Sequence, residues 1–320
     1  MHAASVIMLC WAMIGAACFF SQAMAGVTAG VLAVLVAMVG LPHGAADHRF
    51  ARPRLEPVLG FAWLPVFLIG YLTVAVVVVC GWFIVPAVTI VGFFLASAWH
   101  FGQEEPRLSI GPPTLRPVFR FARGGLVIWT PLVFHSQEVA AILGLATPGS
   151  SAPAIDQAIS LLTGFSWIML TIAAVGWALQ GLVASQRSGR MRRVLWADCG
   201  LVASLAVLCA VASPLVSFPV YFCAWHSARG LQRLRIELGE SWPELARSLA
   251  PLTLGAIALV GLAAWLVLGG AGWNGMLIRA TFVGLSAVAM PHLLLHGVAP
   301  LFEASARRRT LQPLQFGGSA

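Results

Sequence analysis

Residues 26–48 read GVTAGVLAVLVAMVGLPHGAADH, an apolar run that ends in a segment rich in histidine. A membrane-spanning helix needs about 20 consecutive apolar residues, and residues 26–46 supply them. His43 lies late in this predicted helix, with Asp47 and His48 at its end. Ionisable side chains inside a membrane are costly, usually face the interior of a helix bundle and commonly carry function. The stretch therefore predicts a membrane helix that delivers polar groups to a buried site.

The same pattern recurs along the whole chain. Its 320 residues are 59% hydrophobic and only 9% charged, with a mean hydropathy of +0.89. A soluble domain of this size could not cover its surface with so few charges, which leaves a polytopic membrane protein. Apolar segments of spanning length lie near residues 4–24, 26–46, 58–80, 82–102, 122–146, 158–184, 194–213, 215–231, 250–269 and 276–302. We therefore predict an all-α, polytopic integral membrane helix bundle with eight to ten transmembrane helices.

The arginines indicate how these helices are oriented. The net charge is +8, and the chain contains no lysine. Every arginine except Arg279 falls in or beside alternate connections between the predicted helices. Because positive charge gathers in cytoplasmic loops, both termini are predicted to be cytoplasmic, and the charge indicates topology rather than a nucleic-acid partner. We predict one membrane-embedded domain over residues 1–303, in the cell (inner) membrane, and a flexible cytoplasmic tail over residues 304–320.

Four histidines lie late in predicted helices that run in the same direction, so their side chains reach the same leaflet. They are His43, His100, His226 and His292. Imidazole is the commonest nitrogen ligand of iron, copper and zinc in proteins. Asp47 follows His43 by four residues, which places both on one helix face. Glu104 follows His100 at the same spacing. Since a carboxylate can fix the tautomer of a metal-bound histidine, these pairs predict a buried metal centre.

Two other histidines leave alternatives open. His296 follows His292 by one helical turn, and this H-x-x-x-H spacing is a common two-ligand arrangement. Packing of either ring against the carbonyl of a neighbouring helix is the alternative interpretation. His135 lies in a predicted helix that runs the opposite way, and we expect it to be an ordinary core or interfacial residue.

Four motifs, taken in order, resemble those of the Brp/Blh family, the beta-carotene 15,15'-dioxygenases. They are P-H-G-A-x-D-H at residues 42–48, W-H-F-G-Q-E at 99–104, Y-F-x-x-W-H-S-x-R at 221–229, and the Pro291-His292 pair. Their order and spacing are similar over most of residues 30–300. The resemblance implies an all-helical membrane fold that binds Fe(2+) through histidines. It also implies cleavage of the central 15,15' double bond of beta-carotene with O2, which gives two all-trans-retinal molecules.

The resemblance further implies roles for individual residues. His43, His100 and His226 are expected to bind iron. The family commonly has another histidine four residues after the one that matches His226, and this chain has Gly230 there; we expect His292 to be recruited instead. Asp47 and Glu104 are expected to assist catalysis. A slot for the polyene is expected to be lined by Trp99, Phe101, Tyr221, Phe222 and Trp225.

Other functions are compatible with the same residues. A non-catalytic member of this family would bind a carotenoid or retinal, or assist the assembly of a rhodopsin. The histidines would also serve a b-type haem protein, or a proton relay together with Asp47 and Glu104. The resemblance implies beta-carotene or a related carotenoid and O2 as reactants, the lipid bilayer as surroundings, and a functional link to a retinal-binding rhodopsin.

Overall fold

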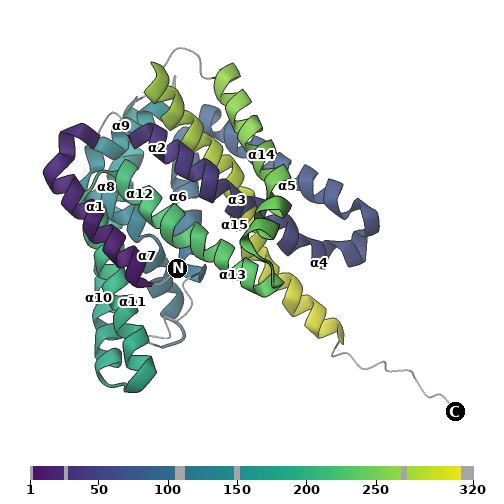
Figure 1. Ribbon diagram of the computed structural model, residues 1–320. Helices are drawn as coiled ribbons and strands as arrows, with labels where there is room; N and C mark the ends of the chain where they lie inside the picture. Colours follow the sequence, from purple (N-terminus) through teal and green to yellow (C-terminus); the bar gives the residue numbers. More distant parts are fainter. Residues whose placement is uncertain (1–2, 25–27, 105–111, 148–151, 268–271, 311–320) are drawn as a thin grey trace.

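The computed structural model describes residues 3–24, 28–104, 112–147, 152–267 and 272–310, and within these ranges every regular element is a helix (Figure 1). The elements are α1 (Ala3–Met24), α2 (Thr28–Leu35), η1 (Val36–Gly40), α3 (Leu41–Ala45), α4 (Asp47–Leu59), η2 (Gly60–Ala62), α5 (Trp63–Ile84), α6 (Pro86–Glu104), α7 (Arg116–Gly124), α8 (Leu126–Phe134), α9 (Ser136–Ala146), α10 (Ala152–Ser185), α11 (Gly189–Val211), α12 (Pro214–Pro219), η3 (Val220–Ser227), α13 (Ala228–Leu238), α14 (Trp242–Val267) and α15 (Gly272–Thr310). The predicted all-α class is confirmed.

Large apolar side chains cover the outside of several helices. On α5 the side chain of Ile69 is 66% exposed, and on α10 that of Leu161 is 70% exposed. Exposed apolar patches of this kind are unfavourable in water and are expected where a helix contacts lipid. Five stretches within the described residues are long and apolar enough to span a membrane, and the bent pair α8–α9 would make a sixth. This supports a multi-pass membrane protein, although the count is lower than the eight to ten helices predicted.

The lower count arises where the apolar runs are joined or broken. Residues 29–84 pass as one stretch that contains two predicted helices. The predicted helix over residues 122–146 is divided, because α8 and α9 meet at His135 with a bend of 108°. Residues 215–231 form the short α12, the π-helical η3 and the start of α13. α15 continues to Thr310, into the segment predicted as a tail, and residues 311–320 lie outside the described residues.

The two largest of four hydrophobic clusters among the described residues form most of the interior. One joins residues of α1, η1, α11, α12 and η3, and the other joins residues of α5, α6, α8, α9, α10 and α15. In Figure 1, α1 lies beside α11, and the long α15 crosses the molecule beside α5. Phe282 of α15 and Ile128 of α8 pack against both clusters. Both residues also line a cavity that the predicted histidine ligands border.

Two π-helical segments adjoin predicted metal ligands. η1 ends directly before α3, which carries His43, and η3 contains His226. π-helical turns are rare, usually interrupt α-helices for a single turn, and often occur at functional sites. The two segments touch, because a Cβ atom on Gly40 would lie only 2.7 Å from Cε1 of Phe222. Only glycine fits this contact, which fixes how the helices of His43 and His226 face each other.

Candidate metal centre

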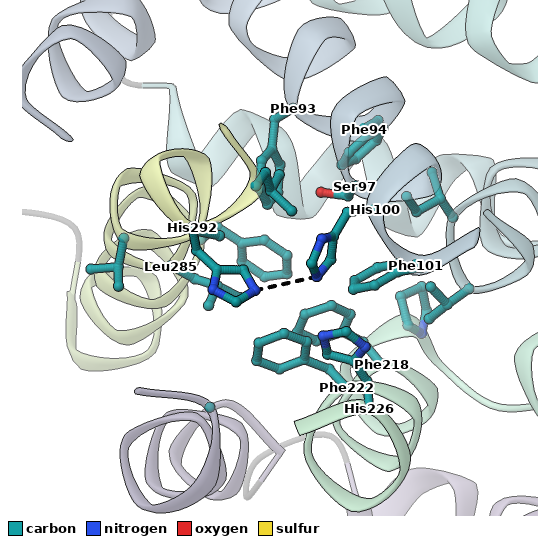
Figure 2. A pocket seen from close by; sticks show the side chains of 18 of the residues that line it. Phe93, Phe94, Ser97, His100, Phe101, Phe218, Phe222, His226, Leu285 and His292 are labelled. Atoms are coloured by element: carbon teal, nitrogen blue, oxygen red, sulfur yellow. Dashed lines mark hydrogen bonds between the residues drawn. The ribbon is translucent and has the colours of Figure 1, made fainter. Parts of the chain in front are cut away.

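Four histidine rings from four separate elements converge at one point. His43 comes from α3, His100 from α6, His226 from η3 and His292 from α15. The ring centroid of His43 lies 5.1 Å from that of His226 and 5.0 Å from that of His292. His100 lies 5.3 Å from His226 and 4.8 Å from His292. Figure 2 shows His100, His226 and His292 directed toward one another. The structure thus brings together all four histidines that the sequence analysis selected.

In this four-histidine cluster, the nitrogen atoms of His100 and His292 have a spacing that suits a metal ion. Nε2 of His100 lies 3.3 Å from Nε2 of His292. Two imidazole nitrogens that each lie about 2.1 Å from one ion are separated by about 3.0 to 3.4 Å at right-angled or tetrahedral coordination. Nε2 of His43 is buried and has no hydrogen-bond partner among the described residues. A buried nitrogen left unpaired costs roughly 1–3 kcal/mol, and a metal ion at the cluster would remove that cost.

Asp47 holds His292 rather than the predicted His43. Its side chain is 2% exposed, and Oδ1 accepts a hydrogen bond from Nδ1 of His292 at 2.7 Å. The prediction assumed one continuous helix, but α3 ends at Ala45 and Asp47 begins α4, so its carboxylate faces α15 instead. A proton held on Nδ1 leaves Nε2 of His292 free to bind a metal.

The same carboxylate contacts a second histidine. Nε2 of His296 lies 3.2 Å from Oδ1 of Asp47, and the ligand atoms of Asp47, His292 and His296 lie within 4.8 Å of one another, close enough to hold an ion. We assign these contacts as hydrogen bonds that support His292, because Asp47 Oδ1 accepts from both rings. The ring of His296 packs on Phe50, with centroids 4.4 Å apart.

Glu104 does not contact His100 among the described residues, contrary to the predicted pairing. Its carboxylate forms an ion pair with Arg233 at 3.3 Å, and its backbone carbonyl accepts a hydrogen bond from Arg229 at 2.7 Å. Since α6 ends at Glu104, the side chain turns toward the arginines of α13 instead of lying along the helix. Glu104 therefore joins the C-terminal end of α6 to α13.

Two further histidines of the described residues have hydrogen-bond partners outside the cluster. Nδ1 of His48 contacts the carbonyl of Ala45 at 2.6 Å. Nε2 of His135 contacts the carbonyl of Ala210 at 3.1 Å, which confirms its expected role as an ordinary, hydrogen-bonded histidine.

A cavity of about 110 Å³ borders the cluster, and the four histidines form part of its wall. Its other lining residues come from η1, α3, α6, α8, α9, α12, η3 and α15, and apart from Ser97 they are apolar or glycine. Figure 2 shows Ser97 beside His100, with Phe93 and Phe94 farther along α6. Apolar cavities of similar size remain dry and bind small hydrocarbons. The cluster therefore faces a chamber suited to an apolar guest.

The five predicted substrate-binding aromatics are divided among three places. Phe101 and Phe222 line the cavity, and the centroid of Phe101 lies 4.8 Å from that of His226. Tyr221 and Trp225 line a smaller, separate pocket. Trp99 lies on the outer face of α6, where it is 46% exposed.

Gly230 is a part of the site that sequence reasoning did not place. A Cβ atom at this position would lie 2.6 Å from Nδ1 of His43 and closer still to Cε1. The backbone of α13 therefore supports the ring of His43 directly, and any side chain would displace it. No helical periodicity signals a contact between α13 and α3. The only signal was the departure of Gly230 from the histidine that the resemblance implies.

Comparisons with known proteins agree with this geometry. The family model "Beta-carotene 15,15'-dioxygenase" matches residues 34–298. A beta-carotene 15,15'-dioxygenase of an uncultured marine bacterium, 66A03, is 27% identical over 273 residues, which cover 82% of this chain and 90% of the relative. A probable beta-carotene 15,15'-dioxygenase Blh of Halobacterium salinarum is 27% identical over 253 residues, 71% of each chain. No solved structure matches. The chain belongs to the beta-carotene 15,15'-dioxygenase family.

Proposed function

We propose that the protein is an iron-dependent oxygenase that cleaves the central 15,15' double bond of beta-carotene with O2 to give two molecules of all-trans-retinal. The observation that carries this proposal is the meeting of four imidazoles at the wall of an apolar cavity. Such a cavity admits a hydrocarbon directly from the bilayer, where carotenoids dissolve. Membership of the family and the names of the two relatives support the same reaction.

The residues of the cluster are suited to hold Fe(2+). His43, His100, His226 and His292 would hold the ion, since neutral imidazoles bind iron without thiolates or further charge. Iron bound there would supply a centre that activates O2. The reaction balances without an external reductant, because one C=C bond and one O2 give two C=O bonds. The site accordingly needs no partner that donates electrons.

Other residues of the chain position these groups. Asp47 keeps the Nδ1 proton of His292 in place, so that Nε2 points to the other rings. Phe101 and Phe222 flank His226 and close the wall around the reacting bond. The apolar lining excludes water, which protects the reaction from competing chemistry. We propose that Asp47 acts only through His292, and that Glu104 supports the fold through Arg229 and Arg233.

The alternative functions fit the geometry less well. A b-type haem requires its two axial histidines on opposite faces of a planar ring, whereas these four rings lie within 5.3 Å of their neighbours. A proton relay requires polar groups along a path, whereas the cavity beyond the histidines offers only Ser97.

We also propose the setting of the enzyme. The membrane domain over residues 1–303 is catalytic and lies in the cell (inner) membrane, with both termini in the cytoplasm. The arginine-rich connections support this orientation. The retinal produced is passed to a retinal-binding rhodopsin.

The test uses bacteria that accumulate beta-carotene. Expression of the wild-type chain is expected to bleach the cells, with retinal recovered by chromatography. His292→Ala is expected to abolish bleaching and lower the ratio of iron to protein. His48→Ala is the matched control, because among the described residues the hydrogen-bond partner of His48 is the carbonyl of Ala45 and not a histidine of the cluster. Orange cells that contain well-folded wild-type protein loaded with iron would refute the proposed reaction, and an unchanged iron ratio in His292→Ala would refute the fourth ligand.

A further inference from the structure

The cavity extends to one side of the four-histidine cluster. On α15, the lining residues Phe282, Leu285 and Ala289 all precede His292. Phe282 lies ten residues before His292, so the cavity reaches roughly 15 Å along this helix at 1.5 Å per residue.

The other ligand-bearing helices show the same offset. Phe93 and Ser97 precede His100 on α6, and Phe218 precedes His226 across α12 and η3. Figure 2 shows Phe93 and Ser97 on the same side of His100. On these helices, the lining residues come before the histidines in sequence or next to them. The long axis of the cavity therefore points away from the C-terminal ends of these helices.

The opposite side of the cluster is filled by charged and hydrogen-bonded side chains. Asp47 contacts His292 and His296 there, and Glu104 contacts Arg229 and Arg233. A hydrocarbon inserted there would separate the buried Asp47 from His292, at a high cost in free energy. An extended carotenoid cannot continue straight past the histidines on this side.

The bent pair α8–α9 lines the cavity, and its α9 packs against α15 at Arg279, beyond Phe282 on the side away from the histidines. Leu143 lines the cavity and is 1% exposed. The wall is held in place by polar contacts: Arg279 donates to the carbonyl of Leu145 at 2.7 Å, and Ser213 donates to the carboxylate of Glu138. A ligand that enters the cavity therefore meets a fixed end.

We propose that the cavity holds one half of the carotenoid, from one end of the molecule to the bond that is cleaved, and that its closed end determines which bond lies against the histidines. This inference rests on the proposed function. The second half extends sideways toward the lipid, because the space beyond the cluster is occupied. Central cleavage then follows from the depth of the cavity. The protein does not need to recognise the centre of the carotenoid.

The test changes the depth of the cavity at Leu143. Leu143→Phe shortens the cavity, so beta-carotene inserts less far and a bond nearer the inserted end reaches the histidines. One C=C bond and one O2 still give two aldehydes, but one is shorter than retinal and the other longer. Leu143→Ala, which lengthens the cavity, is expected to give unequal aldehydes as well. The products are identified by chromatography with mass spectrometry.

The matched control is Leu161→Phe, the same substitution on the outer face of α10, where the residue is 70% exposed. It is expected to yield retinal alone, as the wild type does. If both Leu143 variants form retinal as their only product, whether quickly or slowly, the cavity does not set the cleavage position and the proposal is overturned.

A binding measurement separates this inference from the proposed function. Protein stripped of iron is incubated with beta-carotene in detergent, and the retained pigment is measured by absorption. Leu143→Phe is expected to reduce retention about tenfold or more, because overpacking leaves room for less of the guest, and Leu161→Phe to leave it unchanged. If the wild type binds pigment but never cleaves it, the proposed reaction fails while this pattern still supports the half-cavity. Equal retention in the two variants overturns it.

Discussion

Replacement of Gly230 by alanine tests how closely α13 supports the metal centre. The new Cβ would lie 2.6 Å from Nδ1 of His43, whereas ordinary contact begins at 3.4 Å. The ring of His43 must therefore retreat by at least 0.8 Å. A displacement of about 1 Å in a reacting geometry costs about 100-fold in rate, or about 2.7 kcal/mol. We expect Gly230→Ala to lose activity by this factor and to bind iron about 10- to 100-fold more weakly.

The assay combines iron titration of purified protein with retinal formation from beta-carotene. Gly164→Ala is the matched control, because nothing lies within 4 Å of a Cβ at that position on α10; we expect full iron binding there and slightly higher stability. Gly230→His is expected to be as damaging as Gly230→Ala, because its side chain starts from the same Cβ. Wild-type iron affinity in a folded Gly230→Ala protein would show that His43 is not held by this contact, and the reasoning would be wrong.

Three further predictions concern the surroundings of the site. Asp47→Asn should weaken iron binding about tenfold without unfolding the protein, since the amide orients His292 less firmly; competition with a chelator measures this. Arg279→Met should lower the free energy of unfolding by about 1–3 kcal/mol, because it leaves the buried Arg279 contact with Leu145 unmade, and thermal unfolding should report the loss with iron binding unchanged. Removal of iron from the wild type should lower its thermal midpoint, because an ion at 100 times its dissociation constant stabilises by about 2.7 kcal/mol; added Fe(2+) should restore it.

The sequence was sufficient for the all-α membrane class and for selecting the four histidines that meet. Composition predicted an all-α membrane bundle, because few charges are available to face water. His43, His100, His226 and His292 were selected because an imidazole deep in an apolar helix is costly unless it is used. Each of these inferences uses only a residue and the helix that contains it. Such local properties can be read directly from the sequence.

The partners of those residues could not be predicted in the same way. The spacing of Asp47 and Glu104 favoured His43 and His100, yet the carboxylates contact His292 and Arg233. Both carboxylates lie at helix ends, where the chain turns and i,i+4 geometry no longer applies. The break at His135 was also missed, because the apolar run continues through it without a change of composition. Contacts between distant helices depend on packing, which a single sequence does not display.

The two π-helical segments make the centre sensitive to the length of the chain as well as to its composition. Each places an additional residue in the helix at a metal ligand. Deleting one residue from η1 would let the helix return to regular winding and would rotate His43 by about 100° around the axis. A deletion in η3 would do the same to His226. An engineered or natural variant shortened at either place must regain a residue before the histidine, or the four rings will no longer meet.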